Sequence, residues 1–485
     1  MSLKNETIKG TFWSSVEKLS FLGIQFVLQV ILARLLTPDD YGIVGILAVF
    51  IAIANTFVDC GFTSALIQNQ KRTETDFSTA FYFNFVVALI CYIVLFFSAP
   101  YIASFYKLPI LISVTRVLTL VLPISAIAAV NRTKLQIRVD FKTQTKATLT
   151  SITLSGLIGI ILAYKGFGVW ALVAQMVLNS IFNTILLFVL VKWFPKEKFS
   201  FNSFKRMYDF GIKLLLTSLT DVFYFNMYPL IIGKFFSPAD LGFYSRAHQF
   251  ASIPNKLSIS ILSRVTFPVF SRVQDDLERL FNIYRKYLRL ISSLYAPIVL
   301  LLCAVTKPII LVLLGDKWSG TIVIMQILCM ACFFDCVTNV NMSLLYVKGY
   351  TNIIFKLNIV KKIIAFTILF VSLQWGIIGL CWGQVVYSQI AIFFNTYYTK
   401  KILGLSYFIQ MKDILPIYFV AAVSAFVAYI ITFTDINNLL QLIIAIPLAI
   451  AIYIMLAYIF KFEIIIEMKN LFYILKNKYI VQKNN

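Results

Sequence analysis

The chain has 485 residues, of which 60% are hydrophobic and only 13% are charged. Soluble domains carry about a quarter charged residues, and a soluble protein of this size cannot bury so much apolar surface. The formal net charge of +22 does not indicate nucleic-acid binding, because the basic residues lie in short clusters between apolar runs and a basic binding face needs a soluble scaffold. Composition therefore predicts an all-α integral membrane protein.

The first apolar run follows a short segment that contains Lys4 and Lys9. It extends to about Leu36, which is too long for a signal-peptide core, and no A-x-A-like cleavage site closes it. We therefore expect a first membrane helix that is retained. Further apolar windows follow, each long enough to cross a hydrocarbon core of about 30 Å as a helix. The predicted spans, about fourteen, are 10–36, 42–66, 77–99, 110–131, 144–164, 167–191, 207–235, 242–266, 287–314, 320–346, 355–374, 376–399, 414–433 and 438–460.

Two of the turns between spans are alike. Thr37–Gly42 and Ser237–Gly242 carry proline, aspartate and glycine at the same positions, 200 residues apart. Two halves of six helices each would lie in parallel orientation, as pseudo-symmetric lobes around a central cavity that opens to each side of the membrane in turn. The repeat predicts an N-terminal lobe at 1–200, a C-terminal lobe at 201–402, two appended helices at 403–462 and a cytoplasmic tail at 463–485.

Basic residues are distributed unequally between the two sides of this topology. Of the 43 Lys and Arg residues, 31 lie at the two ends or in connections on the same side, six in the opposite connections and six within spans. The positive-inside rule therefore predicts that both termini are cytoplasmic. Lys361 and Lys362 are counted here in a loop, and the inner end of span eleven is the alternative place for them.

Ionisable side chains at mid-bilayer depth usually face a cavity, because exposure to lipid costs about 2.5–3.5 kcal/mol. Such residues form polar stripes in spans 1, 7 and 8, which belong to both predicted lobes. The stripes are mostly cationic and suit an anionic substrate such as a diphosphate. The candidate cavity residues are Lys18, Gln25, Lys213, Asp221, Arg246, Lys256 and Arg264.

Some of these polar residues have simpler interpretations. Lys213 and Arg264 lie near the inner membrane boundary, where long side chains reach the headgroups. Two further pairs have i, i+4 spacing, and they could bind a coupling cation or gate the inner side. Interhelical hydrogen bonding explains them equally well. These pairs are Asn55 with Asp59 and Asp335 with Asn339.

Catalytic and metal sites have little support in the sequence. Cys329, Cys332 and Cys336 share a helix face, but thiol ligands without a polar second shell make a poor metal site, and His248 is the single histidine. We interpret these cysteines as small buried hydrophobic residues. The sequence lacks a glycine-rich phosphate loop. We expect no metal, no cofactor and no enzyme activity.

Several segments together are similar to a known family. Leu32–Gly42 resembles the first-loop signature of bacterial polysaccharide-transporter flippases, of the multidrug/oligosaccharidyl-lipid/polysaccharide exporter superfamily. Asp59–Gln68, Thr73–Thr79 and Gly168–Leu172 continue the match in order and spacing. The resemblance implies twelve core helices in two lobes. It also implies export of O-antigen, capsule or exopolysaccharide units, carried on undecaprenyl diphosphate, from the cytoplasmic to the periplasmic leaflet of the inner membrane.

The combined interpretation is a flippase for lipid-linked oligosaccharides. The diphosphate would contact Lys18, Arg246 and Lys213, the sugars would occupy the aqueous cavity, and the lipid tail would stay in the bilayer. Na⁺ or H⁺ is a candidate coupling ion, and membrane lipids and the polysaccharide polymerase machinery are candidate partners. The alternatives are a cation-coupled multidrug exporter, a lipid II flippase and a polytopic glycosyltransferase or polymerase. The first would need a more acidic cavity, and the last a sizeable outer loop.

Overall fold

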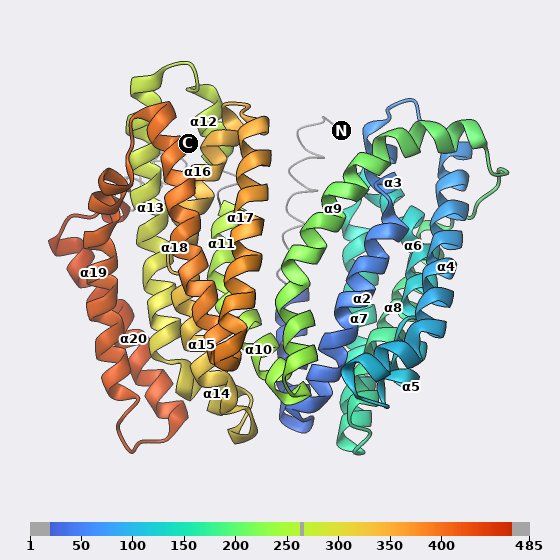
Figure 1. Ribbon diagram of the computed structural model, residues 1–485, viewed down its shortest axis with the longest axis horizontal. Coiled ribbons are helices and arrows are strands. Elements are labelled where there is room, and N and C mark those ends of the chain that lie inside the picture. Colours follow the sequence, from blue (N-terminus) through green and yellow to red (C-terminus); the bar gives the residue numbers. More distant parts are fainter. Residues whose placement is uncertain (1–19, 262–265, 468–485) are drawn as a thin grey trace, which may run out of the picture. The chain divides into compact units, whose positions relative to one another are not determined.

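The computed structural model describes residues 20–261 and 266–467, and within these ranges its regular elements are all helical (Figure 1). A chain that crosses lipid must satisfy its backbone hydrogen bonds internally, which an isolated helix does and an open strand does not. The chain divides into two compact units, and the boundary in the sequence lies between Ser245 and Arg246. We describe each unit separately.

Unit 1 begins with a helix at Ser20–Leu35. The helices that follow are α2 (Pro38–Asp59), α3 (Phe62–Gln68), α4 (Glu74–Tyr106), α5 (Leu111–Leu118), α6 (Val121–Ile137), α7 (Phe141–Tyr164), α8 (Val169–Val191), α9 (Phe201–Phe235) and the first part of α10 (Pro238–Ala251). Capping boxes start α2 and α4, where Thr37 and Thr73 exchange hydrogen bonds with the aspartate three residues later.

Unit 2 contains the end of α10 and the rest of the chain. Its elements are α11 (Ile253–Ile261), α12 (Phe267–Arg272), α13 (Leu277–Ala304), α14 (Thr306–Leu313), the 3₁₀ turn η2 (Asp316–Trp318), α15 (Gly320–Ala331), α16 (Asp335–Val347), α17 (Thr351–Ser372), the 3₁₀ turn η3 (Leu373–Trp375), α18 (Gly376–Leu403), α19 (Tyr407–Ile431) and α20 (Asn438–Ile459).

The predicted all-α membrane fold is confirmed. In the described ranges, eleven helical segments are long and apolar enough to cross a membrane. One of them, Thr351–Leu403, contains both α17 and α18. The first span is represented by Ser20–Leu35, and the span predicted at 242–266 is divided into α10 and α11, next to Pro254. Every predicted span therefore coincides with helix in the part of the chain that the structure describes.

Charges near two predicted loops lie inside helices instead. Lys361 and Lys362 lie within α17, so the loop placement is wrong and the alternative placement in span eleven holds. Arg132 and Lys134 follow the predicted end of span four at residue 131, yet α6 continues to Ile137. The α6 helix therefore extends past the apolar window of span four, and Lys134 in this extension pairs with Glu74.

The two similar turns lie against each other at the starts of α2 and α10. A Cβ atom on Gly42 would be 1.8 Å from the carbonyl oxygen of Pro238, and one on Gly242 would be 2.1 Å from that of Pro38. Only glycine permits backbones to approach so closely. The turn motif of the sequence repeat therefore builds a reciprocal contact, which we call the glycine crossing (Gly42, Gly242 and the two prolines).

A buried cation joins three segments of unit 1. Lys134 of α6 is 5% exposed, and its Nζ lies 2.7 Å from Oε1 of Glu74 at the start of α4. The same ammonium lies 4.4 Å and 4.5 Å from the ring centroids of Phe77 and Trp193, and Trp193 Nε1 donates to Glu74 Oε2. A buried charge needs such an ion pair and such ring faces to offset its lost hydration.

We predict that Gly42→Ala destabilises the protein by about 1–3 kcal/mol, the range for forcing extra atoms into a packed site. A thermal melt of the purified protein in detergent measures the effect. Gly23→Ala is the matched control, because a Cβ there meets nothing within 4 Å. Equal melting temperatures for the two variants would contradict the glycine crossing.

We also predict that Glu74→Gln lowers the melting temperature more than Lys134→Met does. The first change leaves a buried ammonium without its carboxylate, whereas the second removes the buried charge and leaves the exposed Glu74 in contact with solvent. The double variant should resemble Lys134→Met alone. The opposite order would show that the ion pair does not hold these segments together.

Candidate functional site

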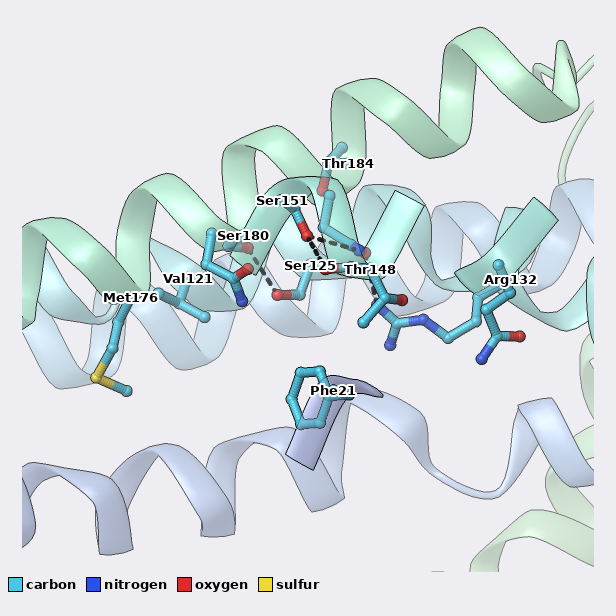
Figure 2. A pocket seen from close by; sticks show the side chains of 12 residues that line it. Phe21, Val121, Ser125, Arg132, Thr148, Ser151, Met176, Ser180 and Thr184 are labelled. Carbon is cyan, nitrogen blue, oxygen red and sulfur yellow. Dashed lines mark hydrogen bonds between the residues drawn. The ribbon is translucent and has the colours of Figure 1, made fainter. Parts of the chain in front are cut away.

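A polar cavity of about 590 Å³ lies within unit 1, between α6, α7 and α8 (Figure 2). Eight of its twelve lining residues carry a hydroxyl or amide group. They include Ser125 of α6, Thr148 and Ser151 of α7, and Asn179, Ser180 and Asn183 of α8. The polar residues of α8 recur at a spacing of three to four, which places them on one helix face. We call this space the α8 cavity.

Hydrogen bonds between the three helices hold this wall in place. Ser125 Oγ lies 2.9 Å from Ser180 Oγ, and Asn183 Nδ2 donates to Ser151 Oγ at 3.3 Å. Arg132 of α6 donates from Nη2 to Asn183 Oδ1 at 3.1 Å (Figure 2). The α8 cavity is thus a pre-formed polar surface within segments that are otherwise apolar enough to lie in lipid.

A second cavity of about 450 Å³ adjoins the first and shares Ser125 and Arg132 with it. Asn55 and Asp59 of α2 line this second space together with Asn84 of α4. The structure thus brings one of the two predicted polar pairs to a cavity wall. Arg132 places a cation on the same wall as the Asp59 carboxylate, so the site carries both signs of charge.

The other predicted residues of unit 1 lie away from these two cavities. Gln25 is half-buried in the first helix, and Lys213 and Asp221 are exposed on α9. None of the three lines either cavity. Lys18 lies outside the described residues.

In unit 2, Arg246 and Lys256 occupy different helices. Arg246 of α10 is half-buried and donates from Nη1 to Gln249 Oε1 at 2.7 Å. Lys256 is exposed on α11. Arg264 falls in the gap between the described ranges.

Asp335 and Asn339 follow a break in a membrane helix. The turn at 332–334 separates α15 from α16, and Asp335 begins α16. Tyrosine hydroxyls cap two carbonyls at this break: Tyr295 donates to Cys332 O at 2.6 Å and Tyr418 donates to Phe333 O at 2.7 Å. Asn339 donates to Asn255 Oδ1 of α11 at 2.8 Å, so it makes an interhelical hydrogen bond.

A buried polar chain crosses five helices of unit 2. Lys361 of α17, 9% exposed, donates to Asn395 Oδ1 of α18 at 3.3 Å. The hydroxyl group of Thr399, one turn further along α18, lies within hydrogen-bond reach of the Asn395 carbonyl and of Asn341 Oδ1 of α16. The side chain of Asn341 then joins Tyr284 of α13 and Gln410 of α19.

Comparison with known proteins places this architecture in a family. The family model described as "Polysaccharide biosynthesis protein" matches residues 31–323. The chain belongs to this family. The matched segment begins within the first helix and runs through both cavities of unit 1 into α15.

Individual relatives agree with the family assignment. The chain is 28% identical over 307 residues to the succinoglycan biosynthesis transport protein ExoT of Rhizobium meliloti, across 63% of this chain and 62% of that protein. It is 26% identical to the lipopolysaccharide biosynthesis protein WzxC of Escherichia coli, across 86% of this chain and 83% of the relative. Its fold matches the lipid II flippase MurJ in an inward closed conformation, with a TM-score of 0.71 and 16% identity over 93% of this chain and 98% of that one.

Two charged residues that bond to a neighbouring helix, Arg132 and Lys361, were not predicted from the sequence as site residues. Arg132 directly follows the apolar window that ends at residue 131, so the sequence places it in a loop. Asn131 and Thr133 on either side of it are also polar, and this run of polar residues was the signal for a helix that continues and packs against other helices. Lys361 stands beside a second lysine, which is typical of a cytoplasmic loop. In both cases the missing information is which helix packs against the residue.

The polar chain of unit 2 leads to a stability prediction. Lys361→Met removes a buried amine that donates to the side-chain amide of Asn395. This change should raise the melting temperature, because apolar replacement of a buried charge is often stabilising. Asn395→Leu removes that amide and should lower the melting temperature. Lys356→Met, on an exposed position of the same helix, is the control and should be neutral. If Lys361→Met and Asn395→Leu destabilise equally, the amine makes a net favourable contribution.

Proposed function

We propose that this protein is a flippase that moves lipid-linked oligosaccharide repeat units from the cytoplasmic to the outer leaflet of the bacterial inner membrane. The observation that carries the proposal is the α8 cavity, a preformed polar space within helices whose composition suits lipid. A saccharide headgroup cannot cross hydrocarbon without such a space, because each unpaired hydroxyl group would cost several kcal/mol, on the order of 4–8.

The relatives support this substrate class. ExoT is named for succinoglycan transport and WzxC for lipopolysaccharide biosynthesis, and the fold is similar to that of a lipid II flippase. A transporter rather than an enzyme fits the same set of names.

We assign the finer features of the mechanism as part of this proposal. Undecaprenyl diphosphate is the carrier, and its charge is held by Lys18, Lys213 and Arg246 through charge-assisted hydrogen bonds. Lobes 1–200 and 201–402 alternate between inward-open and outward-open states, with both termini cytoplasmic. Binding shifts the balance between these states by the difference in affinity of the substrate for each.

We further propose a coupling ion and a partner protein. Asp59 with Asn55, or Asp335 with Asn339, would bind Na⁺ or H⁺ and link the ion gradient to the change of state. Contact with the polysaccharide polymerase would allow each translocated unit to be consumed at the outer surface.

A reconstitution assay tests the function directly. The purified full-length protein is placed in liposomes with a fluorescent undecaprenyl-diphosphate oligosaccharide in both leaflets, and a membrane-impermeant glycosidase measures how fast the inner pool becomes accessible. We expect rapid exposure, and at least a tenfold slower rate for the double variant Lys18→Gln, Arg246→Gln. The control is Lys205→Gln, at an exposed position.

Two results would overturn the proposal. One is exposure of the labelled lipid no faster than in protein-free liposomes. The other is efficient export of a cationic dye by the same preparation with no movement of the lipid, which would indicate a multidrug exporter. A normal rate in the double variant would refute only the diphosphate assignment.

A further inference from the structure

Arg116 places a positive charge inside an apolar segment of unit 1. It belongs to α5, and α5 lies within the stretch Leu111–Ile137 that is apolar enough to cross a membrane. Among the residues that the structure describes, no side chain or carbonyl group forms a hydrogen bond or an ion pair with its guanidinium group. A charge in such a segment is costly unless a partner offsets its lost hydration. We therefore looked for a partner from outside the chain.

The contact that Arg116 makes with an aromatic ring leaves part of the guanidinium group available. Its Cζ atom lies 4.5 Å from the centroid of the Phe96 ring of α4, which is a cation–π distance. Nε is enclosed, whereas the side chain as a whole is half-buried, so the two Nη groups remain for a ligand. A guanidinium group stacked on a ring directs its N–H bonds outward in its own plane. Two such bonds fit two oxygens of one phosphate group.

The depth of Arg116 puts it within reach of lipid headgroups. The 33 residues of α4 form a helix about 50 Å long, against a hydrocarbon core of about 30 Å. A centred α4 extends about 10 Å past each boundary, and Phe96 lies about 15 Å before its end at Tyr106, so the ring is about 5 Å inside the hydrocarbon. In unit 1, α5 lies beside this end of α4 (Figure 1). Because side chains lean toward the N-terminus of their helix, Arg116 leans toward this boundary.

The surface beside Arg116 is apolar and suits the chains of a lipid. Ile93 and Phe97 of α4 and Val117 of α5 are all exposed. Arg116 lines neither the α8 cavity nor the second cavity of unit 1. The sugars of a transported lipid would therefore lack polar partners on this surface. A phospholipid meets no such difficulty, because its small headgroup projects into water while its acyl chains lie along apolar side chains.

We propose that Arg116 binds the phosphate group of a phospholipid where α5 lies beside the end of α4. The two Nη groups donate to two phosphate oxygens, the Phe96 ring holds the guanidinium group in place, and the acyl chains lie along Ile93 and Phe97. The bound lipid supplies the negative charge that the described part of the chain does not place beside Arg116. This site is separate from both cavities of unit 1, and it holds its lipid without transporting it.

Native mass spectrometry of the full-length protein tests this site without any transport step. Protein in detergent is titrated with phosphatidylglycerol and, separately, with diacylglycerol, which has the same acyl chains and no phosphate. The fraction of protein that carries one lipid gives each affinity. We expect phosphatidylglycerol to bind at least tenfold more tightly than diacylglycerol. Arg116→Gln should weaken phosphatidylglycerol binding about tenfold, as the loss of one charge-assisted contact implies, and should leave diacylglycerol binding unchanged.

Three further variants separate this site from a general effect of charge. Lys107→Gln is the matched control, because it removes one positive charge from an exposed position at the same end of α4, and it should not change the affinity. Arg116→Lys keeps the charge without the fork of donors, and it should bind phosphatidylglycerol with intermediate affinity. Phe96→Leu removes the ring and keeps an apolar side chain, so it should weaken binding by a smaller factor than Arg116→Gln. The last two variants also test the site if Arg116→Gln fails to fold.

Three results would overturn the proposal. Unchanged phosphatidylglycerol binding in all the Arg116 and Phe96 variants would show that this side chain only reaches the bulk headgroups. An equal loss of binding in Lys107→Gln would show an effect of overall charge. A tenfold preference for undecaprenyl phosphate over phosphatidylglycerol would assign Arg116 to the transported carrier instead. The liposome assay of flipping bears on none of these outcomes, because the mass spectrum measures binding alone.

Discussion

Polar groups inside a bilayer must find their partners within the protein, and this constraint accounts for most of what the structure shows. It makes the chain helical, since helices satisfy their own backbone. Where α15 ends before α16 begins, two tyrosine hydroxyls bond the carbonyls of Cys332 and Phe333. Where a lysine is buried in α6, a glutamate and two aromatic rings surround it.

The two units meet this constraint in different ways. In unit 2, the chain from Lys361 through Asn395 and Thr399 to Asn341 joins side chains to one another, and such networks favour one arrangement of the helices. In unit 1, the faces of α6, α7 and α8 enclose a space, and Asn179 Oδ1 has no hydrogen-bond donor among the residues that the structure describes. A cavity wall with unsatisfied hydrogen-bonding groups destabilises the protein when the cavity is empty, but it suits a protein that binds a hydrophilic ligand there.

The sequence was sufficient for the fold because hydrophobic windows and turn residues report on single helices. The spans and the similarity of the two turns both follow from local pattern. The site depends on which faces meet, and this is a property of pairs of helices. Asp59 is predicted from its i, i+4 spacing with Asn55. Arg132 was not, because a charge just beyond an apolar window is indistinguishable from a loop charge until its contact with Asn183 is known.

The glycine crossing restricts how this protein can recover from damage. At most tight contacts, an enlarged side chain can be accommodated when a facing side chain is trimmed. Here the atom facing each glycine is a main-chain oxygen, of Pro238 or of Pro38, and no substitution removes it. Genetic suppressors of a Gly42 variant should therefore arise at positions that alter the tilt or spacing of α2 and α10, and not at the residue in contact.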